Sequence, residues 1–364
     1  MLAAQKAALG LAIPEISLKS VDYSILLSLK NHSIMKTLSA FVALISLIVL
    51  LSQASADTGF TIEEVPSGLI IKHNGELVTN YVIDQANKPY MWPLIGPNRK
   101  PMTRAYPMQD IEGERQDHPH HRSIWFGHQN MGGFDTWTES MTYTEREEWT
   151  KERIDEALAK IGRTVHREFS QLDANEKRAI VKTKNDYVGS AGEKLLSDER
   201  TIIFRKTNSQ LIIDFDISLI ASYGDIELGD IKDAGLCVRI PTALDLKTGK
   251  GGTIINSEGI RDGDTWSKRA TWVDYNGLMD GERVGIAILN HPSSFNHPTP
   301  WHVRDYGLFT ANPFGFKSLD ESREDITFTL AKGTRVLMKH RIIFHKGDEK
   351  KAKIAQAFER YAKQ

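Results

Sequence analysis

Apolar and polar residues alternate with a period of two along most of the chain. In the segment 211–219 every odd position is apolar, while Asp214, Asp216 and Ser218 stand at even positions. Successive side chains of a β-strand point to opposite faces, so this pattern predicts a strand with one face in a core and the other in water. The segments 326–330 and 336–344 repeat the alternation, which also places His340 on a core face.

A tight hairpin is predicted within residues 68–83. Asn74 and Gly75 separate two runs that are rich in apolar residues. Both residue types adopt the positive φ angles that a two-residue type I′ turn requires. Further strands are predicted at 123–128, 137–149, 161–171, 176–187, 193–206, 235–240, 252–257, 267–275, 282–290 and 303–310.

Only two stretches favour a helix, 151–160 and 348–362. In the second, Ile354, Ala355 and Phe358 fall on one helical face. Many closely spaced strands with so few helices predict an all-β fold. We expect a large antiparallel β-sandwich of the supersandwich kind, with a C-terminal helix.

The N-terminal part of the chain has a different character. Met35 and Lys36 precede an uncharged apolar run that ends at Leu51, and Ala54-Ser-Ala56 follows. A positive start, a short apolar run and small residues before a cleavage site predict a signal peptide over 35–56, hence a periplasmic or secreted protein. An uncleaved anchor is the alternative, although a membrane-spanning helix needs about 20 apolar residues. Residues 1–34 would be a misassigned upstream start, and 57–364 a single mature domain without a membrane segment.

The charge balance limits the range of binding partners, and the cysteine content limits the possible disulfides. The chain has 46 Lys and Arg against 47 Asp and Glu, which gives no electrostatic reason to bind nucleic acid. The one cysteine, Cys237, lies in an apolar run and is expected to be a buried small residue. An intramolecular disulfide is therefore excluded.

Histidines are concentrated in two short segments. The first is 117–128, Asp-His-Pro-His-His-Arg-Ser-Ile-Trp-Phe-Gly-His. If the chain is extended there, His118, His120, Arg122 and His128 share one side and His121 takes the other. The proline makes regular pairing unfavourable at the start, so we expect a loop that enters a strand near Arg122.

The second histidine segment spans 290–305. Three prolines make it a stiff, irregular loop that can hold His291, His297 and His302 without regular pairing. Arg304 would share the side of His302, with Asp305 opposite. A smaller polar set, 230–233, precedes the Cys237 strand and Arg239.

Histidine in such clusters has several uses. Its unperturbed pKa lies near neutrality, and it is also a common metal ligand, so Zn, Mn or Fe could be bound. A single histidine is more often a hydrogen-bonded structural residue, and we expect His73, His166 and His345 at the surface or in strands. The sequence has no HExxH helix motif, and no P-loop, dinucleotide fingerprint or Gly-x-Ser-x-Gly elbow stands in the right context.

The longest motifs resemble a known family. Residues 117–128, 232–236 and 290–315 are similar to the PmoA-like family of exported bacterial proteins, and the similarity spans most of the mature domain. The resemblance implies a β-sandwich like that of galactose-mutarotase-like proteins. Those enzymes use a histidine as general acid and a carboxylate as general base on sugar rings.

We therefore expect an exported enzyme, an epimerase, lyase or hydrolase, that acts on a small carbohydrate or carbohydrate derivative through acid–base chemistry. The expected acid, base or ligand groups are His118, His121, His128 and His302, with Asp305 or Asp117 as the carboxylate. The expected substrate-binding residues are Arg122, Arg304, His291, Trp125, Trp137 and Trp301. Two alternatives stay open: a non-catalytic carbohydrate-binding module, and a metal-dependent oxygenase or hydrolase with a divalent cofactor.

Overall fold

The computed structural model describes residues 58–364, and the segments of alternating polarity form its strands. The predicted signal peptide at 35–56 and the upstream stretch lie outside the described residues. The described residues pack as one compact unit. Within the described part of the chain, no helix has the length and apolar character needed to cross a membrane.

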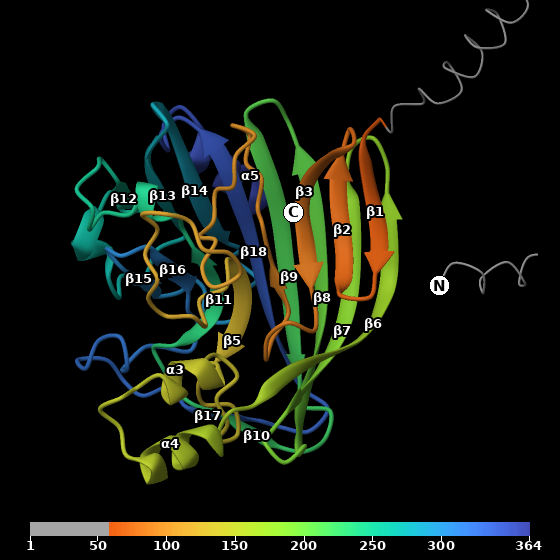
Figure 1. Ribbon diagram of the computed structural model, residues 1–364, viewed down its shortest axis with the longest axis vertical. Helices are drawn as coiled ribbons and strands as arrows, with labels where there is room; N and C mark the ends of the chain where they lie inside the picture. The colour runs from red at the N-terminus through yellow and green to blue at the C-terminus, as the bar shows by residue number, and fades with distance from the viewer. Residues whose placement is uncertain (1–57) are drawn as a thin grey trace, which may run out of the picture. The chain divides into compact units, whose positions relative to one another are not determined.

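Two eight-stranded antiparallel sheets make up the body of the protein (Figure 1). The first sheet has the order β1 (Phe60–Val65), β2 (Gly68–His73), β3 (Glu76–Val82), β4 (Tyr90–Met91), β5 (Ile124–His128), β11 (Ala234–Arg239), β16 (Leu308–Ala311) and β15 (Trp301–Val303). The second has the order β12 (Thr253–Asn256), β13 (Trp272–Met279), β14 (Glu282–Asn290), β18 (Arg335–Lys346), β9 (Gln210–Ile220), β8 (Lys194–Lys206), β7 (Ala179–Val188) and β6 (Arg163–Ala174). A two-stranded sheet pairs β10 (Ile226–Leu228) with β17 (Phe328–Leu330).

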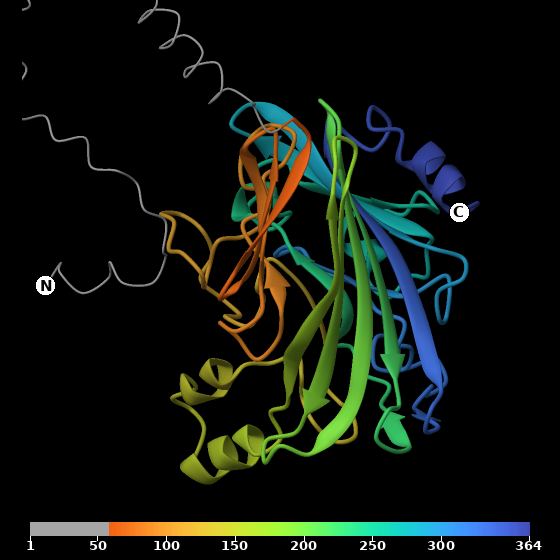
Figure 2. The same cartoon turned by 90° about the vertical axis from the view of Figure 1, so that its right-hand side faces the viewer.

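The all-β sandwich is confirmed. The two large sheets lie as layers, as Figure 2 shows from the side, and one apolar cluster draws buried side chains from both. Leu69 and Phe126 come from the first sheet, and Phe204 and Ile213 from the second. Burying such side chains contributes about 1.5–3 kcal/mol each, which makes this interlayer cluster the main source of stability.

The hairpin at Asn74 and Gly75 forms as predicted. The φ angles of these residues are 52° and 76°, and His73 pairs with Glu76 across the turn between β2 and β3. Both positive angles belong to the type I′ geometry that the dipeptide favours. Cys237 is buried, also as predicted.

Three expectations about strands were wrong. The segment 137–149 contains the short helix α3 (Ser140–Thr144), and α4 (Lys151–Leu158) follows it. Thr150 caps α4 by accepting a hydrogen bond from the Arg153 backbone at 3.3 Å. The segment 303–310 is interrupted by a turn between β15 and β16, and the strand expected at 267–275 begins only at Trp272. The strands β1, β4 and β10 were not predicted.

The C-terminal helix α5 (Ile354–Tyr361) covers part of the outer face of the second sheet. It packs on Trp272, Leu289 and Ile343. Asp214, expected in water on this face, is therefore buried and accepts a hydrogen bond from Arg341 at 3.0 Å. His345, expected at the surface or in a strand, is a strand residue of β18 that is fully buried 2.6 Å from Asp274. His340 is buried, as its periodicity predicts.

Gly235 in β11 offers a direct test of the close pairing in the first sheet. Its φ is 111°, and an added Cβ would lie 2.0 Å from the Ala311 carbonyl oxygen. Since backbone strain and a clash with the neighbouring strand add up, Gly235→Ala should lower the unfolding free energy by about 2–5 kcal/mol. Gly192→Ala is the control, because Gly192 has φ 92° but open space around it. Equal losses in urea unfolding of the two variants would contradict the packing described here.

Candidate active site

A buried arginine shapes the turn that carries the first histidine segment. Arg104 donates from Nη1 to the Asp117 carbonyl at 2.6 Å and from Nη2 to the His118 carbonyl at 2.8 Å. His118 has φ 48°, and the His121 backbone N–H closes the turn onto the His118 carbonyl at 3.0 Å. A bulky residue in the left-handed region costs about 1–3 kcal/mol, so the arginine clamp holds a strained conformation in place.

This turn determines which side chains of the first histidine segment point in the same direction. The segment is a loop that enters a strand, as expected, but β5 starts only at Ile124, and Ser123 also has a positive φ of 55°. As a result His118, His120 and His121 line one cavity together, whereas Arg122 faces away from it. The condition under which His118, His120, Arg122 and His128 would share one side, an extended chain, is therefore not met.

The cavity, here called the histidine cavity, has a volume of about 610 Å³. Its walls come from the turn 117–121, the segment 137–146, Lys232 with Asp233, Lys247, His302 and the residues 304–306. The segments 117–121 and 302–306 are far apart in the sequence. They meet because β5, β11, β16 and β15 are consecutive neighbours in the first sheet.

One row of side chains connects the two segments across the sheet. Trp125 pairs with Cys237, Cys237 with Thr310, and Thr310 with His302. Paired residues lie on the same face of a sheet. Their neighbours Phe126 and Trp301 belong to the interlayer core, so the row lies on the outer face of the first sheet, and the histidine cavity is built there.

The hydrogen bonds of His302 define its tautomer. Its Nδ1 lies 2.7 Å from the Lys232 carbonyl oxygen, which can only accept, so Nδ1 carries the proton. Burial lowers the pKa of His302 to about 3, and the ring is therefore neutral at pH 7. Its Nε2 keeps a lone pair and has no hydrogen-bond partner among the described residues. Asp233 lies 3.5 Å from Nδ1, and burial raises the pKa of its carboxyl group.

On the other wall, His118 pairs with Asp117. His118 Nδ1 lies 3.1 Å from Asp117 Oδ2. The Asp117 carboxylate also accepts hydrogen bonds from Arg104 and Arg239. Burial opposes ionisation of Asp117, but the hydrogen bond from His118 and the two guanidinium charges outweigh it and hold its pKa well below the usual range. This carboxylate stays charged across the physiological pH range.

Stacked rings fix the histidines of this wall. His118 stacks on His121 with ring centroids 4.7 Å apart, and its other face stacks on Tyr306 at 5.2 Å. His121 continues the column onto Trp125 at 5.3 Å. Arg239 lies 3.1 Å from His121 Nδ1, and because arginine only donates, the proton of neutral His121 is on Nε2. Burial lowers the pKa of His121 well below the ordinary value.

The geometry can be set beside known proteins. A search of curated proteins found no match. The model of DUF6807, a family described as being of unknown function, matches residues 69–359. The chain belongs to this family. The resemblance to PmoA-like proteins noted from the motifs stays a prediction.

Several solved structures overlap with this DUF6807 protein at low similarity. A β-arabinopyranosidase shares 11% identity over 79% of this chain, with a TM-score of 0.36. A galactose mutarotase-like protein from Lactobacillus casei ATCC 334 shares 8% over 79% of this chain and 100% of its own, with a TM-score of 0.35. A glycoside hydrolase family 97 enzyme from Pseudoalteromonas sp. strain K8 shares 9% over 79%, with a TM-score of 0.28. The chain spans 40% of the arabinopyranosidase and 34% of the family 97 enzyme.

In this DUF6807 protein, only some of the predicted site residues lie together in the structure. The predicted site residues that line the histidine cavity are Asp117, His118, His121, His302, Arg304, Asp305 and Trp137. Trp125 lies beneath His121 and is only 1% exposed. Trp301 points into the interlayer core because it precedes His302 on the strand, and its Nε1 donates to the Ala270 carbonyl at 2.9 Å.

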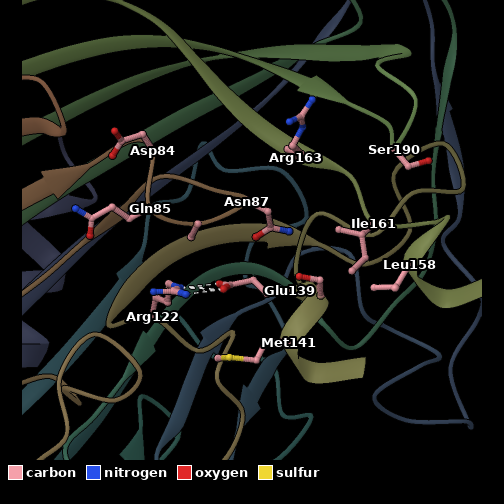
Figure 3. Close-up of a pocket in the computed structure, with 12 residues that line it drawn as sticks. Asp84, Gln85, Asn87, Arg122, Glu139, Met141, Leu158, Ile161, Arg163 and Ser190 are labelled. Carbon is pink, nitrogen blue, oxygen red and sulfur yellow. Dashed lines mark hydrogen bonds and ion pairs between the residues drawn. The ribbon is translucent and has the colours of Figure 1, made fainter. Parts of the chain in front are cut away.

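Three other predicted residues lie outside the cavity. His128 faces the core beside Phe314, with ring centroids 4.8 Å apart. His291 packs against Tyr361 of α5 at 4.9 Å. Arg122 makes a bidentate pair with Glu139 and lines a separate cavity of about 660 Å³, which Figure 3 shows.

Sequence reasoning missed several cavity residues. Lys247, Thr142 and Arg146 line the histidine cavity and belong to no histidine motif, and Tyr306, which also lines it, was not among the expected site residues. Lys232 and Asp233 were noted only as part of a smaller polar set. Within the described residues, no group of three or more His, Cys, Asp or Glu side chains is arranged to hold a metal ion.

Neutral buried histidines should make stability depend on pH. Burial lowers the pKa of His128, His302 and His340 to about 3. The unfolded chain takes up protons near pH 6.5 while the folded chain does not, so this stability is present above pH 6.5 and is lost as the pH falls towards 3. Each group should cost about 2 kcal/mol between pH 7 and pH 5.

This pH dependence can be measured without disturbing the cavity, because His340 lies in the second sheet. The slope of the unfolding free energy against pH near 5.5 should correspond to about one proton fewer in His340→Gln than in the wild type. An unchanged slope would mean that His340 is charged in the folded protein.

Proposed function

We propose that the chain is an exported enzyme that acts on a carbohydrate or carbohydrate derivative by acid–base chemistry in the histidine cavity. The observation that carries the proposal is the placement of two imidazole–carboxylate pairs, His302 with Asp233 and His118 with Asp117, on the walls of one polar cavity. The volume of about 610 Å³ falls in the range of small-molecule sites. The export part of the proposal rests on the predicted signal peptide at 35–56.

The two pairs support different roles. His302 offers an unprotonated Nε2 as general base, and Asp233 would stabilise the imidazolium that forms when His302 takes a proton. His118 is more exposed, with 41% of its side chain accessible, and can exchange protons with solvent as the general acid. A positioned acid or base typically contributes a factor of about 10²–10⁴ in rate.

Other cavity residues would bind and orient the substrate. Neutral His121 would present its Nε2–H as a donor, with Arg304 and Asp305 as further partners for hydroxyl groups. His128, His291 and Trp301 have no part in the proposal, because the structure places them elsewhere. A binding module that relies on stacking tryptophans is less well supported, because Trp125, Trp137 and Trp301 are each no more than 1% exposed.

Proton NMR in D₂O with a panel of sugars tests the proposal. The panel comprises neutral aldoses, the matching uronic acids and disaccharides, followed for anomeric exchange, loss of C–H signals or bond cleavage. The wild type should convert at least one class, and Asp233→Asn, which keeps the side-chain shape, should be slower by about 10²-fold or more. Sugar binding without any conversion would contradict an enzymatic role, and conversion at equal rates by both proteins would contradict the role proposed for Asp233.

A further inference from the structure

Cations without acidic partners surround the histidine cavity. Lys232, Lys247 and Arg304 all line it, and within residues 58–364 none of the three forms an ion pair. Arg304 and His302 both contact the Trp266 ring, and the Lys232 carbonyl oxygen lies 2.7 Å from His302 Nδ1, so both cationic residues are neighbours of His302. Three charged side chains that converge on one cavity without counter-ions leave a positive field inside it.

The acidic groups of the cavity do not cancel this field. Asp117 is already held by two buried guanidinium groups, those of Arg104 and Arg239. This group of three side chains therefore adds a net positive charge to the wall. Asp233 is half-buried and Asp305 is exposed, so these two carboxylates are outnumbered by the three cations Lys232, Lys247 and Arg304. The charge balance at the wall favours a negatively charged ligand.

Arg304 is positioned by contacts with aromatic rings and not by a carboxylate partner. Its guanidinium carbon lies 4.7 Å from the centre of the Trp266 ring and 5.5 Å from that of Tyr306. Stacking on ring faces positions a guanidinium group and leaves its N–H edge available. A planar oxyanion such as a carboxylate is the group that this edge binds best.

We propose that the substrate is a sugar acid, whose oxyanion is bound by Arg304 and Lys232 beside His302. This inference rests on the proposed function, because it names the substrate class of the same cavity. An anion there would also favour the protonated form of His302. It would raise the pKa of an imidazole that is a weak base in the empty cavity and bring it closer to the neutral range that suits a general base.

The inference is tested by calorimetric titration of the full chain with matched ligands. The pairs are glucose with glucuronate and galactose with galacturonate, and glucose 6-phosphate separates a phosphate from a carboxylate. The wild type should bind a uronate about 10-fold or more tightly than its neutral partner, and the difference should shrink as salt is added. Tighter binding of glucose 6-phosphate than of the uronates would overturn the assignment of a carboxylate.

Two variants test which residues bind the oxyanion of the ligand. Arg304→Gln and Lys232→Gln should each lower the preference for the uronate over its neutral partner by about 10-fold. Lys250→Gln is the matched control, since Lys250 is exposed and lines a different cavity. Equal affinity for uronates and neutral sugars, or no binding of either, would overturn the inference.

The result of this test can be distinguished from the result of the test of the proposed function. Uronate binding that depends on Arg304, without any conversion, would support the anion site and contradict the enzyme. Conversion of neutral sugars that is slowed in Asp233→Asn would support the enzyme and overturn the anion site.

Discussion

An Arg104→Met variant should unfold with a free energy about 3–5 kcal/mol lower than that of the wild type. Arg104 is fully buried and donates to the Asp117 carboxylate and to the carbonyl groups of Asp117 and His118. Methionine fills most of the same space but donates no hydrogen bond. The half-buried Asp117 carboxylate therefore loses one of its two guanidinium partners, and the two carbonyl groups lose this donor. Urea unfolding monitored by tryptophan fluorescence measures the loss.

Two comparisons separate this effect from a general loss of charge. Arg178 is exposed and forms no ion pair within the described part of the chain, so Arg178→Met should change the unfolding free energy by less than about 0.5 kcal/mol. Arg104→Lys keeps the charge but not the fork of donors, and should fall between the wild type and Arg104→Met. A stability of Arg104→Met within 1 kcal/mol of the wild type would refute the clamp.

His302→Ala and His121→Ala should fold but lose turnover of the converted sugar by about 10²–10⁴-fold. His302 is the proposed base, and His121 is the donor at the centre of the stacked column. Steady-state rates with the sugar identified by NMR give the comparison. The His302→Ala cavity has room for a small base, so added imidazole should restore part of kcat in this variant at high pH.

The control for these variants is His166→Ala. His166 lies on β6 and contacts Thr183 at 2.9 Å, away from the cavity. Its substitution should leave kcat and KM unchanged. Full activity of both His302→Ala and His121→Ala would remove the two imidazoles from the mechanism, and a loss of circular dichroism signal would show a structural role instead.

The strands could be predicted because alternation is a local property of the sequence. Positions 211–219 specify both a strand and its core face without reference to any other segment. The exposure of the opposite face could not be predicted in the same way. Asp214 is buried by α5, which lies more than a hundred residues later in the chain.

The site was harder to predict for the same physical reason. The histidine motifs indicated the right segments, but alternation along β5 and β15 decides which side chains reach the cavity. Trp301 and His128 therefore face the core. The turn at His118 depends on Arg104, whose role no motif near 104 indicates. Tyr306 and Lys247 reach the cavity only because of the order of strands in the first sheet.

The row Trp125–Cys237–Thr310–His302 has a consequence for how the protein can change. Most alternate residues of β5, β11, β16 and β15 contribute to the interlayer core, and the residues between them face the side of the sheet on which the cavity lies. Ligand preference can therefore change through substitutions at the outward positions, because the inward residues maintain the packing between the two sheets. A library restricted to the outward positions that line the cavity should yield mostly folded proteins with altered ligand preference.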